Sequence, residues 1–321
     1  MAPNAHRRSD RLPRHHGARG HPRLGRSPAH AHRGHPRLIG LRSRRGSRGT
    51  GGHVTAASFD EAIAHTPLGD GRFRTATPPS WMASGRVPAG LVEAQLFAGL
   101  AAVVTDPQYR PLSFTAHLLR APGEGDYEVT TEVLRTGRTL ISAAARIDQD
   151  GKLIATALAS FATDRPSPDF NEMPMPQVQP PTAERKNDGY IPEFAYPYGD
   201  NVVMQDRLGP KPFTAPDGPM ERVGWAGFAQ ARPIDAPGLL MIGDIGMMGW
   251  WARLDHMHTT ATLDHTTHFR ADLSNVDADD MVLLRSRTGL VRGGYLDWDL
   301  DIWAPDGTLL CQSRQMLAIL G

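Results

Sequence analysis

The chain has 321 residues, 40% of them apolar, and its 35 Lys and Arg nearly balance 34 Asp and Glu, giving a formal net charge of +1. This length exceeds the ~150 residues of a common single domain, so one large domain or two smaller ones are expected. The single cysteine, Cys311, excludes an intrachain disulfide framework and a multi-cysteine zinc module, and no apolar run approaches the ~20 residues of a membrane-spanning helix.

The first fifty residues carry a charge that the total conceals. They contain 13 Arg, seven His, no Lys and one acid, Asp10, so they are net +12 while the rest of the chain is net −11. Frequent Pro and Gly oppose a helix and the few apolar side chains cannot form a core, so residues 1–52 are predicted to be a disordered tail. A nucleic-acid arm and a transit-like peptide are the alternatives, since clustered Arg attracts phosphate and transit peptides are Arg-rich and acid-poor.

Helical and strand patterns begin at Ser58. Ser58 and Glu61 have the spacing of a capping box, which predicts the start of a short helix. The mostly apolar segment 90–104 predicts a long buried helix. Asp150-Gly151 predicts a tight hairpin, because Gly supplies the positive φ of a type I′ turn. The strands predicted around these features lie at 112–119, 127–135, 139–148 and 152–163.

The pattern then recurs after residues 166–190, a Pro-rich, polar segment without periodicity that predicts a linker. A second long apolar helix is predicted at 237–254. The strands predicted after it lie at 259–270, 281–287, 294–303 and 308–320. The segment 113–122 also parallels 263–272, with Arg120 matched to Arg270. This repetition predicts an α+β protein in which one unit, a helix packed against an antiparallel sheet, is used twice.

Several chemical motifs are missing, and one carboxylate stands out. The sequence contains no G-x-S-x-G nucleophile elbow, no Walker A motif and no dinucleotide-binding glycine pattern after a strand. Asp244 interrupts a segment that is otherwise apolar on all sides, so its carboxylate must be paired, hydrogen-bonded or neutralised by a raised pKa. A cap at the start of a helix and a catalytic group are the two interpretations.

The segment 254–270 is rich in His and Asp and raises the question of a metal site. Because side chains alternate along a strand, Thr262, Asp264, Thr266 and His268 are expected on one face and His265 on the other. No known metal-binding spacing is present, so no metal is predicted. The candidate ligands considered are His256, His258, Asp264, His265 and His268.

The strand predicted at 294–303 alternates apolar residues with three aspartates. This pattern predicts one buried face and one acidic face exposed to solvent. An acidic row of this kind opposes a large contact with the same row of a second copy.

Four passages of the sequence carry a resemblance to a known family. They are LSFTAHLLRAP (112–122) with TEVLRTGRTLISAAARIDQDGK (131–152), MIGDIGMM around Asp244, ATLDHTTHFR (261–270) and PDGTLLCQSRQML (305–317). Taken together, they resemble the acyl-CoA thioesterase II-like family, whose members are double hotdogs: tandem domains, each with a long helix wrapped by an antiparallel sheet. The resemblance implies an N-terminal hotdog at 53–165 and a C-terminal hotdog at 191–321.

The same resemblance implies a chemistry. Asp244, Thr262 and Gln315 of the C-terminal hotdog are expected to surround a water that attacks the thioester, with Asp244 as the general base. Backbone N–H groups at a helix start are the expected donors to the thioester oxygen. No cofactor and no covalent enzyme intermediate are implied.

The expected partner is an acyl-CoA substrate, in a cytoplasmic enzyme of lipid metabolism whose folded part binds no nucleic acid. A homodimer is a candidate assembly. A hotdog hydratase or dehydratase is an alternative that would need a His five residues after the Asp, where Gly249 stands. A hotdog that binds acyl groups without turnover is the non-enzymatic alternative.

Removal of residues 1–52 is expected to leave folding and thioester hydrolysis intact, because the predicted site residues and the predicted core all lie beyond them. The measurement compares the thermal unfolding midpoint and the rate of CoA thiol release between the full chain and the truncated one. A truncated chain that fails to fold or loses its activity would show that the basic segment is required.

Overall fold

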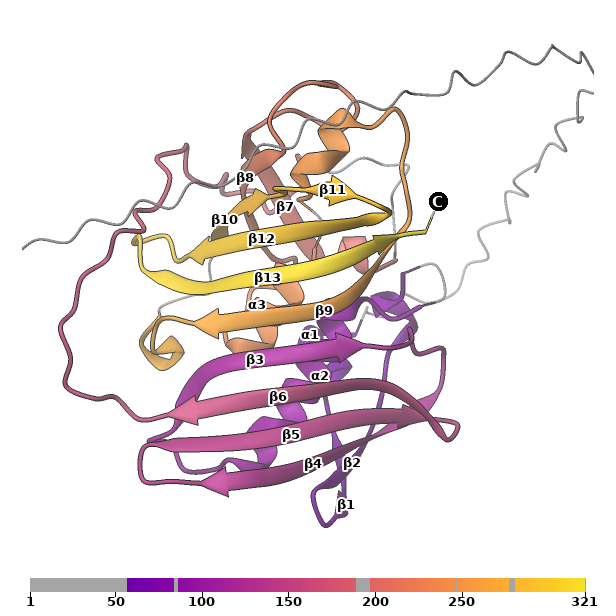
Figure 1. Ribbon diagram of the computed structural model, residues 1–321, viewed down its shortest axis with the longest axis vertical. Helices are drawn as coiled ribbons and strands as arrows, with labels where there is room; N and C mark the ends of the chain where they lie inside the picture. The colour runs from indigo at the N-terminus through magenta and orange to yellow at the C-terminus, as the bar shows by residue number, and fades with distance from the viewer. Residues whose placement is uncertain (1–56, 84–85, 189–196, 246, 277–280, 321) are drawn as a thin grey trace, which may run out of the picture. The chain divides into compact units, whose positions relative to one another are not determined.

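The computed structural model describes residues 57–83, 86–188, 197–245, 247–276 and 281–320. The segment 1–52, for which disorder is predicted, lies outside these ranges. Within them the chain forms one large antiparallel sheet and few helices, which confirms the expected α+β class (Figure 1). None of the helices in these ranges has both the length and the apolar character that a membrane crossing requires.

The first half of the folded chain follows the predicted order closely. Its elements are α1 (Phe59–Ala62), β1 (Thr66–Gly69), β2 (Arg72–Ala76), a 3-10 helix (Pro79–Trp81), α2 (Ala89–Val103), β3 (Arg110–Leu118), β4 (Asp126–Thr136), β5 (Leu140–Gln149) and β6 (Lys152–Ala162). The predicted capping box forms at α1, where the Glu61 N–H donates to Ser58 Oγ and the Ser58 N–H donates to Glu61 Oε2. At the predicted hairpin, Asp150 and Gly151 have φ of 50° and 71°, as a type I′ turn requires.

The second half contains the four strands predicted for it and three that the sequence pattern did not indicate, β7, β8 and β11. Its elements are a 3-10 helix (Pro197–Asp200), β7 (Val202–Leu208), β8 (Glu221–Phe228), α3 (Ala236–Gly243), a 3-10 helix (Gly249–Arg253), β9 (Thr260–Phe269), a 3-10 helix (Leu273–Asn275), β10 (Val282–Arg287), β11 (Val291–Arg292), β12 (Tyr295–Trp303) and β13 (Leu309–Ile319).

The long helix predicted at 237–254 is wrong in its extent. Helix α3 ends at Gly243, Asp244 is its C-terminal cap, and a separate 3-10 helix begins at Gly249. Gly243 and Gly249 weaken a continuous helix here, because each interior Gly costs about 1 kcal/mol relative to Ala. The start of α3 is capped by Asp235, whose Oδ1 accepts from the Gly238 N–H over 2.8 Å. Asp244 therefore does not mark a helix start, as one interpretation proposed.

The two halves of the chain arrange their strands in the same way, each counted from its own outer edge of the sheet to the centre. The first half contributes β1-β2-β4-β5-β6-β3 and the second half contributes β9-β13-β12-β10-β8-β7, with β11 added beside β12. The two halves join at the centre, where β3 pairs antiparallel with β9 over Ser113–His117 and Asp264–His268 (Figure 1). This order agrees with the predicted repetition of one unit and places both halves in a single sheet.

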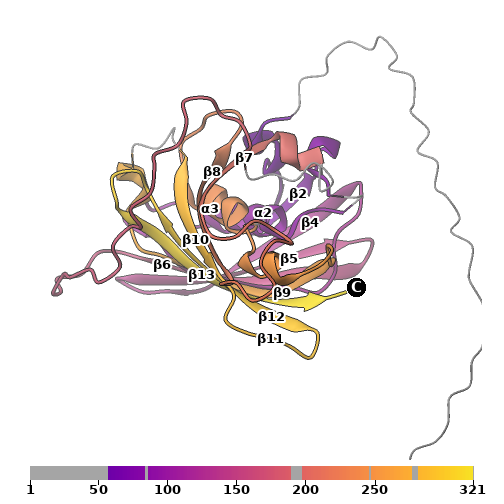
Figure 2. The same cartoon turned by 90° about the horizontal axis from the view of Figure 1, so that it is seen from above.

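Helices α2 and α3 lie side by side on the same face of the curved sheet (Figure 2). One continuous hydrophobic core surrounds them and draws on both halves. Helix α2 is buried through most of its length because nearly all of its side chains are apolar. The core side chains with at most 1% exposure include Leu91, Leu96, Leu100, Leu239, Leu240 and Met241.

The prediction that one face of β12 is acidic and exposed to solvent is also wrong. Asp297 and Asp301 are 7% and 2% exposed, because their carboxylates are paired with Arg314 and Arg287. The outer face of β7, β8 and β10 is covered by part of the segment between β6 and β7, whose Met173 carbonyl accepts from the Trp303 indole. A smaller outer core forms there from Val203, Val223, Trp225, Met281 and Leu283, with Met175 and Val178 packed against it.

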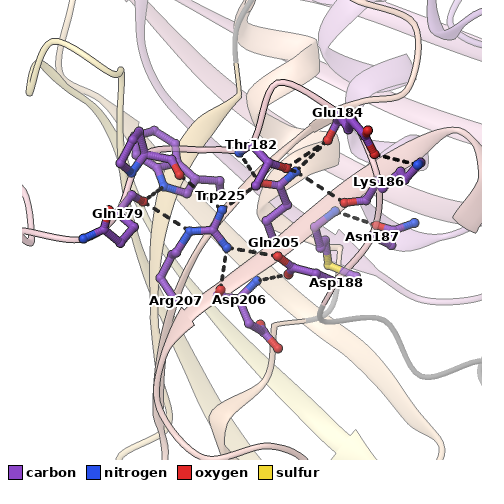
Figure 3. A network of polar contacts seen from close by, with 12 residues as sticks. Gln179, Thr182, Glu184, Lys186, Asn187, Asp188, Gln205, Asp206, Arg207 and Trp225 are labelled. Atoms are coloured by element: carbon purple, nitrogen blue, oxygen red, sulfur yellow. Dashed lines mark hydrogen bonds and ion pairs between the residues drawn. The ribbon is translucent and has the colours of Figure 1, made fainter.

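Gln205, on β7, ties this connecting segment to the sheet (Figure 3). Its side chain is fully buried. Its amide nitrogen donates to Thr182 Oγ1 and to the carbonyls of Glu184 and Lys186, and its Oε1 accepts from the Thr182 N–H over 2.9 Å. One side chain thereby satisfies backbone groups of residues 182–186, a described stretch that forms no helix or strand.

Replacement of Gln205 by Ala is expected to lower the free energy of unfolding by about 2–3 kcal/mol, because this fully buried side chain and its part-buried hydrogen bonds to residues 182–186 are lost. Chemical denaturation measures this change, and limited proteolysis should cut the segment faster. Lys186→Ala is the matched control, because its exposed side chain pairs with the equally exposed Glu184 and should change stability by less than about 0.5 kcal/mol. Equal stability of the two variants would contradict the role of Gln205.

Candidate active site

The three residues singled out by the sequence come from three elements and lie close together. Asp244 caps the end of α3, Thr262 lies on β9 and Gln315 lies on β13. The Thr262 hydroxyl donates to Gln315 Oε1 over 3.2 Å, and Gln315 Nε2 donates to the carbonyl of Gly243, the residue before Asp244, also over 3.2 Å. The hydrogen bonds therefore run from β9 through β13 to the end of α3.

A bulge in β9 gives Thr262 its orientation. The pairing of β9 with β13 shifts between Asp264 and Thr262, so Leu263 has no partner across the ladder. Because of this extra residue, Thr262 turns to the inner side that His265 also faces, and Leu263 becomes exposed. The expectation that Thr262 and His265 point to opposite faces is wrong, since strict alternation does not pass through a bulge.

Asp244 is held by the first half of the chain. The N–H of Gly90, at the start of α2, donates to Asp244 Oδ2 over 2.7 Å. This N–H belongs to the group expected to stabilise the thioester oxygen, but here it binds the carboxylate, which a helix start favours. The approach requires glycine: a Cβ at position 90 would lie 2.6 Å from the Asp244 Cβ and 3.0 Å from the Leu240 carbonyl oxygen.

A cavity of about 840 Å³ opens beside these residues. Asp244 and Thr262 line it, whereas Gln315 is 1% exposed and lies behind them, outside the lining. Much of the remaining lining is apolar, and the volume suits a substrate-sized ligand. Apolar and cationic lining residues include Val92, Met248, Trp251, Arg86 and Arg120. The cavity thus combines an apolar wall with a carboxylate and a hydroxyl.

The surroundings of Asp244 favour its neutral form more than water does. Burial, followed by repulsion from the nearby Glu93 carboxylate, raises its pKa to about 7. The hydrogen bond from Gly90, the charge of His265 and the Gln315 side chain act in the opposite direction without cancelling this rise. A carboxyl group with a pKa near 7 can both accept and return a proton near neutral pH.

Glu93 and His265 form a buried pair next to Asp244. Glu93 Oε2 lies 2.6 Å from His265 Nδ1, and the side chains are 0% and 1% exposed. Burial opposes a charge on the imidazole, but Glu93, Asp244 and Asp264 outweigh it, so the pKa of His265 is raised. His265 is one of the candidate metal ligands named from the sequence, whereas Glu93 is not among the residues that the sequence pattern singles out. A lone acid inside the apolar segment 90–104 is the signal that could have found it, as it did for Asp244.

The candidate metal ligands fall into two separate groups in the fold. Asp255, His256 and His258 place one ligand atom each within 4.8 Å of one another on the segment before β9. Asp255 and His256 are 89% and 65% exposed, as is common for surface groups without a metal. His265 is engaged with Glu93 behind the cavity wall, so the five predicted candidates do not converge. The prediction of no metal stays a prediction.

Comparison with protein families supplies two matches that together cover most of the folded chain. A model of the acyl-CoA thioesterase N-terminal domain matches residues 77–162, and a model of the acyl-CoA thioesterase C-terminal domain matches residues 172–319. No curated protein matches the sequence.

Solved structures share the fold at low sequence identity. A protein of unknown function with a hot dog fold from Alicyclobacillus acidocaldarius has a TM-score of 0.72 and 22% identity, covering 82% of this chain and 98% of its own. A structure described as a putative thioesterase II from Thermobifida fusca has a TM-score of 0.67 and 22% sequence identity, and the match covers 81% of this chain and 97% of the Thermobifida chain. The acyl-CoA thioesterase II TesB2 from Mycobacterium marinum has a TM-score of 0.64 and 20% sequence identity, and the match covers 81% of this chain and 96% of the Mycobacterium chain. At these identities the likeness concerns the fold alone.

Gly90→Ala is expected to separate the start of α2 from the end of α3, because the added methyl group would overlap the Asp244 side chain and the α3 backbone. We expect a loss of about 1–3 kcal/mol in the free energy of unfolding and a change in the titration of Asp244. Gly123→Ala is the control, since a Cβ there meets nothing within 4 Å. A Gly90→Ala protein as stable as the control would contradict the close approach described here.

Proposed function

The chain belongs to the acyl-CoA thioesterase family, and on that premise we propose that it hydrolyses an acyl-CoA to a free carboxylic acid and CoA. The observation that carries the proposal is Asp244, a carboxyl group with a pKa of about 7 that lines a largely apolar cavity together with Thr262. An acyl chain needs the apolar wall, and hydrolysis needs a base beside it.

In the proposed mechanism Asp244 and Thr262 orient the attacking water. The Thr262 proton is donated to Gln315, so the hydroxyl oxygen is left as an acceptor. A water that donates one hydrogen to Asp244 and the other to Thr262 keeps its lone pair free for the thioester carbonyl carbon. This arrangement supports general-base catalysis with a positioned nucleophile.

Proton transfer through Asp244 balances the proposed reaction. Attack forms a carbon–oxygen bond and moves one water proton to the Asp244 carboxylate. Collapse of the tetrahedral intermediate breaks the carbon–sulfur bond, and Asp244 returns the proton to the departing CoA thiolate. A pKa of about 7 suits both transfers, because the group is a usable base before the attack and a usable acid after it.

Gln315 is given a positioning role in this proposal. It lies outside the cavity lining, accepts the Thr262 proton and donates to the Gly243 carbonyl. It therefore fixes the direction of the Thr262 hydroxyl and the end of α3. Its replacement should weaken the orientation of the water, whereas replacement of Asp244 removes the base.

We also propose that the two halves are hotdog domains fused in tandem, with boundaries at 53–165 and 191–321 and a linker at 166–190. The mirrored strand order and the paired helices support this division. Only the junction of the two halves brings Gly90 to Asp244, so the proposal gives one such site to the fused pair.

The alternative functions make different demands on the site. A hydratase or dehydratase needs an imidazole that works with Asp244 on the substrate. His265 lies outside the cavity lining and is bonded to Glu93 and Thr267, and His258, which does line the cavity, does not stand five residues after Asp244, where Gly249 is found. A non-catalytic acyl-binding protein would not need a carboxyl group with a pKa near 7 in its cavity. Both observations favour hydrolysis.

The test of the proposed function is release of CoA thiol from a panel of acyl-CoAs of increasing chain length. Asp244→Asn should reduce kcat by at least about 100-fold, because the base is lost while its shape is retained. Asp169→Asn, an exposed carboxylate on the connecting segment, is the control and should keep full activity. Absence of thiol release from every acyl-CoA would refute the function, and a fully active Asp244→Asn variant would refute the role of Asp244.

A further inference from the structure

The buried pair of Glu93 and His265 has no part in the mechanism above, although it joins the two halves beside Asp244. Glu93 comes from α2 and His265 from β9. Both imidazole nitrogens have partners, since Nδ1 meets Glu93 at 2.6 Å and Nε2 meets Thr267 Oγ1 at 3.3 Å. Neither side chain of the pair lines the cavity, so the pair does not contact the substrate directly.

Stability alone does not account for this pair. Two ionisable groups lose their hydration when they are buried, and apolar side chains of similar volume often stabilise a core equally well or better. Glu93 Oε1 is also buried and has no hydrogen-bond partner among the residues that the structure describes, which adds to the cost. The neighbours of Glu93 on α2 show that apolar residues suit this helix.

The position of the pair relates it to Asp244. Glu93 follows Gly90 by three residues, so the two face the same side of α2, and the Gly90 N–H holds Asp244 at 2.7 Å. The Glu93 carboxylate disfavours the charged form of Asp244, and the charge of His265 favours it more weakly. The other described groups around Asp244 are the uncharged Gln315 from β13 and, lining the cavity, Arg86, Arg120 and His258.

We propose that Glu93 and His265 are positioning residues for the reaction, forming a buried pair whose charges determine how readily Asp244 takes the proton of the attacking water. The inference rests on the proposed role of Asp244 as the base. The Glu93 carboxyl group disfavours the charged form of Asp244, and His265, bonded to Glu93 over 2.6 Å, holds Glu93 in place and limits its effect. The pair therefore acts through Asp244, from behind the cavity wall.

Substitutions of the two members are expected to act in opposite directions. Glu93→Gln removes the charge that disfavours ionised Asp244 and also the main reason for His265 to be charged. Because the Glu93 effect is the larger one, the pH midpoint of kcat/KM should fall by about half to one pH unit. His265→Gln leaves the Glu93 charge uncompensated, so the midpoint should rise by a similar amount.

The test is the pH dependence of kcat/KM for CoA thiol release by the full chain. Wild type, Glu93→Gln, His265→Gln and the double variant are compared, with circular dichroism to confirm folding. The exposed Glu132→Gln on β4 is the matched control and should keep the wild-type midpoint. The double variant carries no charge at the pair, so it should reverse the rise caused by His265→Gln and match Glu93→Gln.

Opposite shifts of the two single variants, with the double variant matching Glu93→Gln, would support the inference, because a purely structural defect lowers the rate without moving the midpoint in two directions. Unchanged midpoints, or shifts in the same direction, would overturn it. If Glu93→Gln does not fold, His265→Gln decides alone: a raised midpoint supports the inference and an unchanged one refutes it. A wild-type chain without thiol release would refute the proposed function instead.

Discussion

The 2.7 Å hydrogen bond from the Gly90 N–H to Asp244 Oδ2 is the interaction on which the rest of the site depends. It joins the start of α2 in the first half to the end of α3 in the second. The bond forms because glycine lets the two helices approach until no side-chain atom fits between them. The pairing of β3 with β9 holds the same junction from the sheet side. Neither half contains the complete site.

This junction also accounts for the chemistry that we propose. Asp244 is removed from bulk water by the helices and lies near a second carboxylate, Glu93, and both conditions favour its neutral form. The Gly90 N–H and His265 counteract part of that effect, so the carboxyl group is balanced near neutrality rather than locked in one state. Such a balance lets one group serve as base and then as acid, which thioester hydrolysis by water requires.

Much of the architecture could be predicted from the sequence because it is specified locally. The Ser58–Glu61 capping box, the Asp150-Gly151 turn and the apolar run of α2 each depend on neighbouring residues, and each appears in the structure. The extent of α3 could not be read correctly, because apolar character alone did not show that the helix stops before Asp244. The aspartates of β12 were assigned to solvent because their arginine partners lie on other strands.

The candidate site was predictable by residue type but not by arrangement. Asp244, Thr262 and Gln315 were named from a family resemblance, and the structure brings them together. The bulge at Leu263 could not be foreseen, because it depends on the register between β9 and β13. The position of Glu93 inside an apolar segment marks it as unusual in the sequence, but its pairing with His265, 172 residues away along the chain, could not be predicted.

The most direct test of the account is a titration of the Asp244 side-chain carboxyl carbon by NMR, with Asp244→Asn used to assign the resonance. The account predicts a midpoint at a pH of about 7 in the folded chain. A midpoint near 4, the ordinary value for an exposed aspartate, would contradict it, because Asp244 would then be too weak a base for the proposed transfer of a proton from the attacking water.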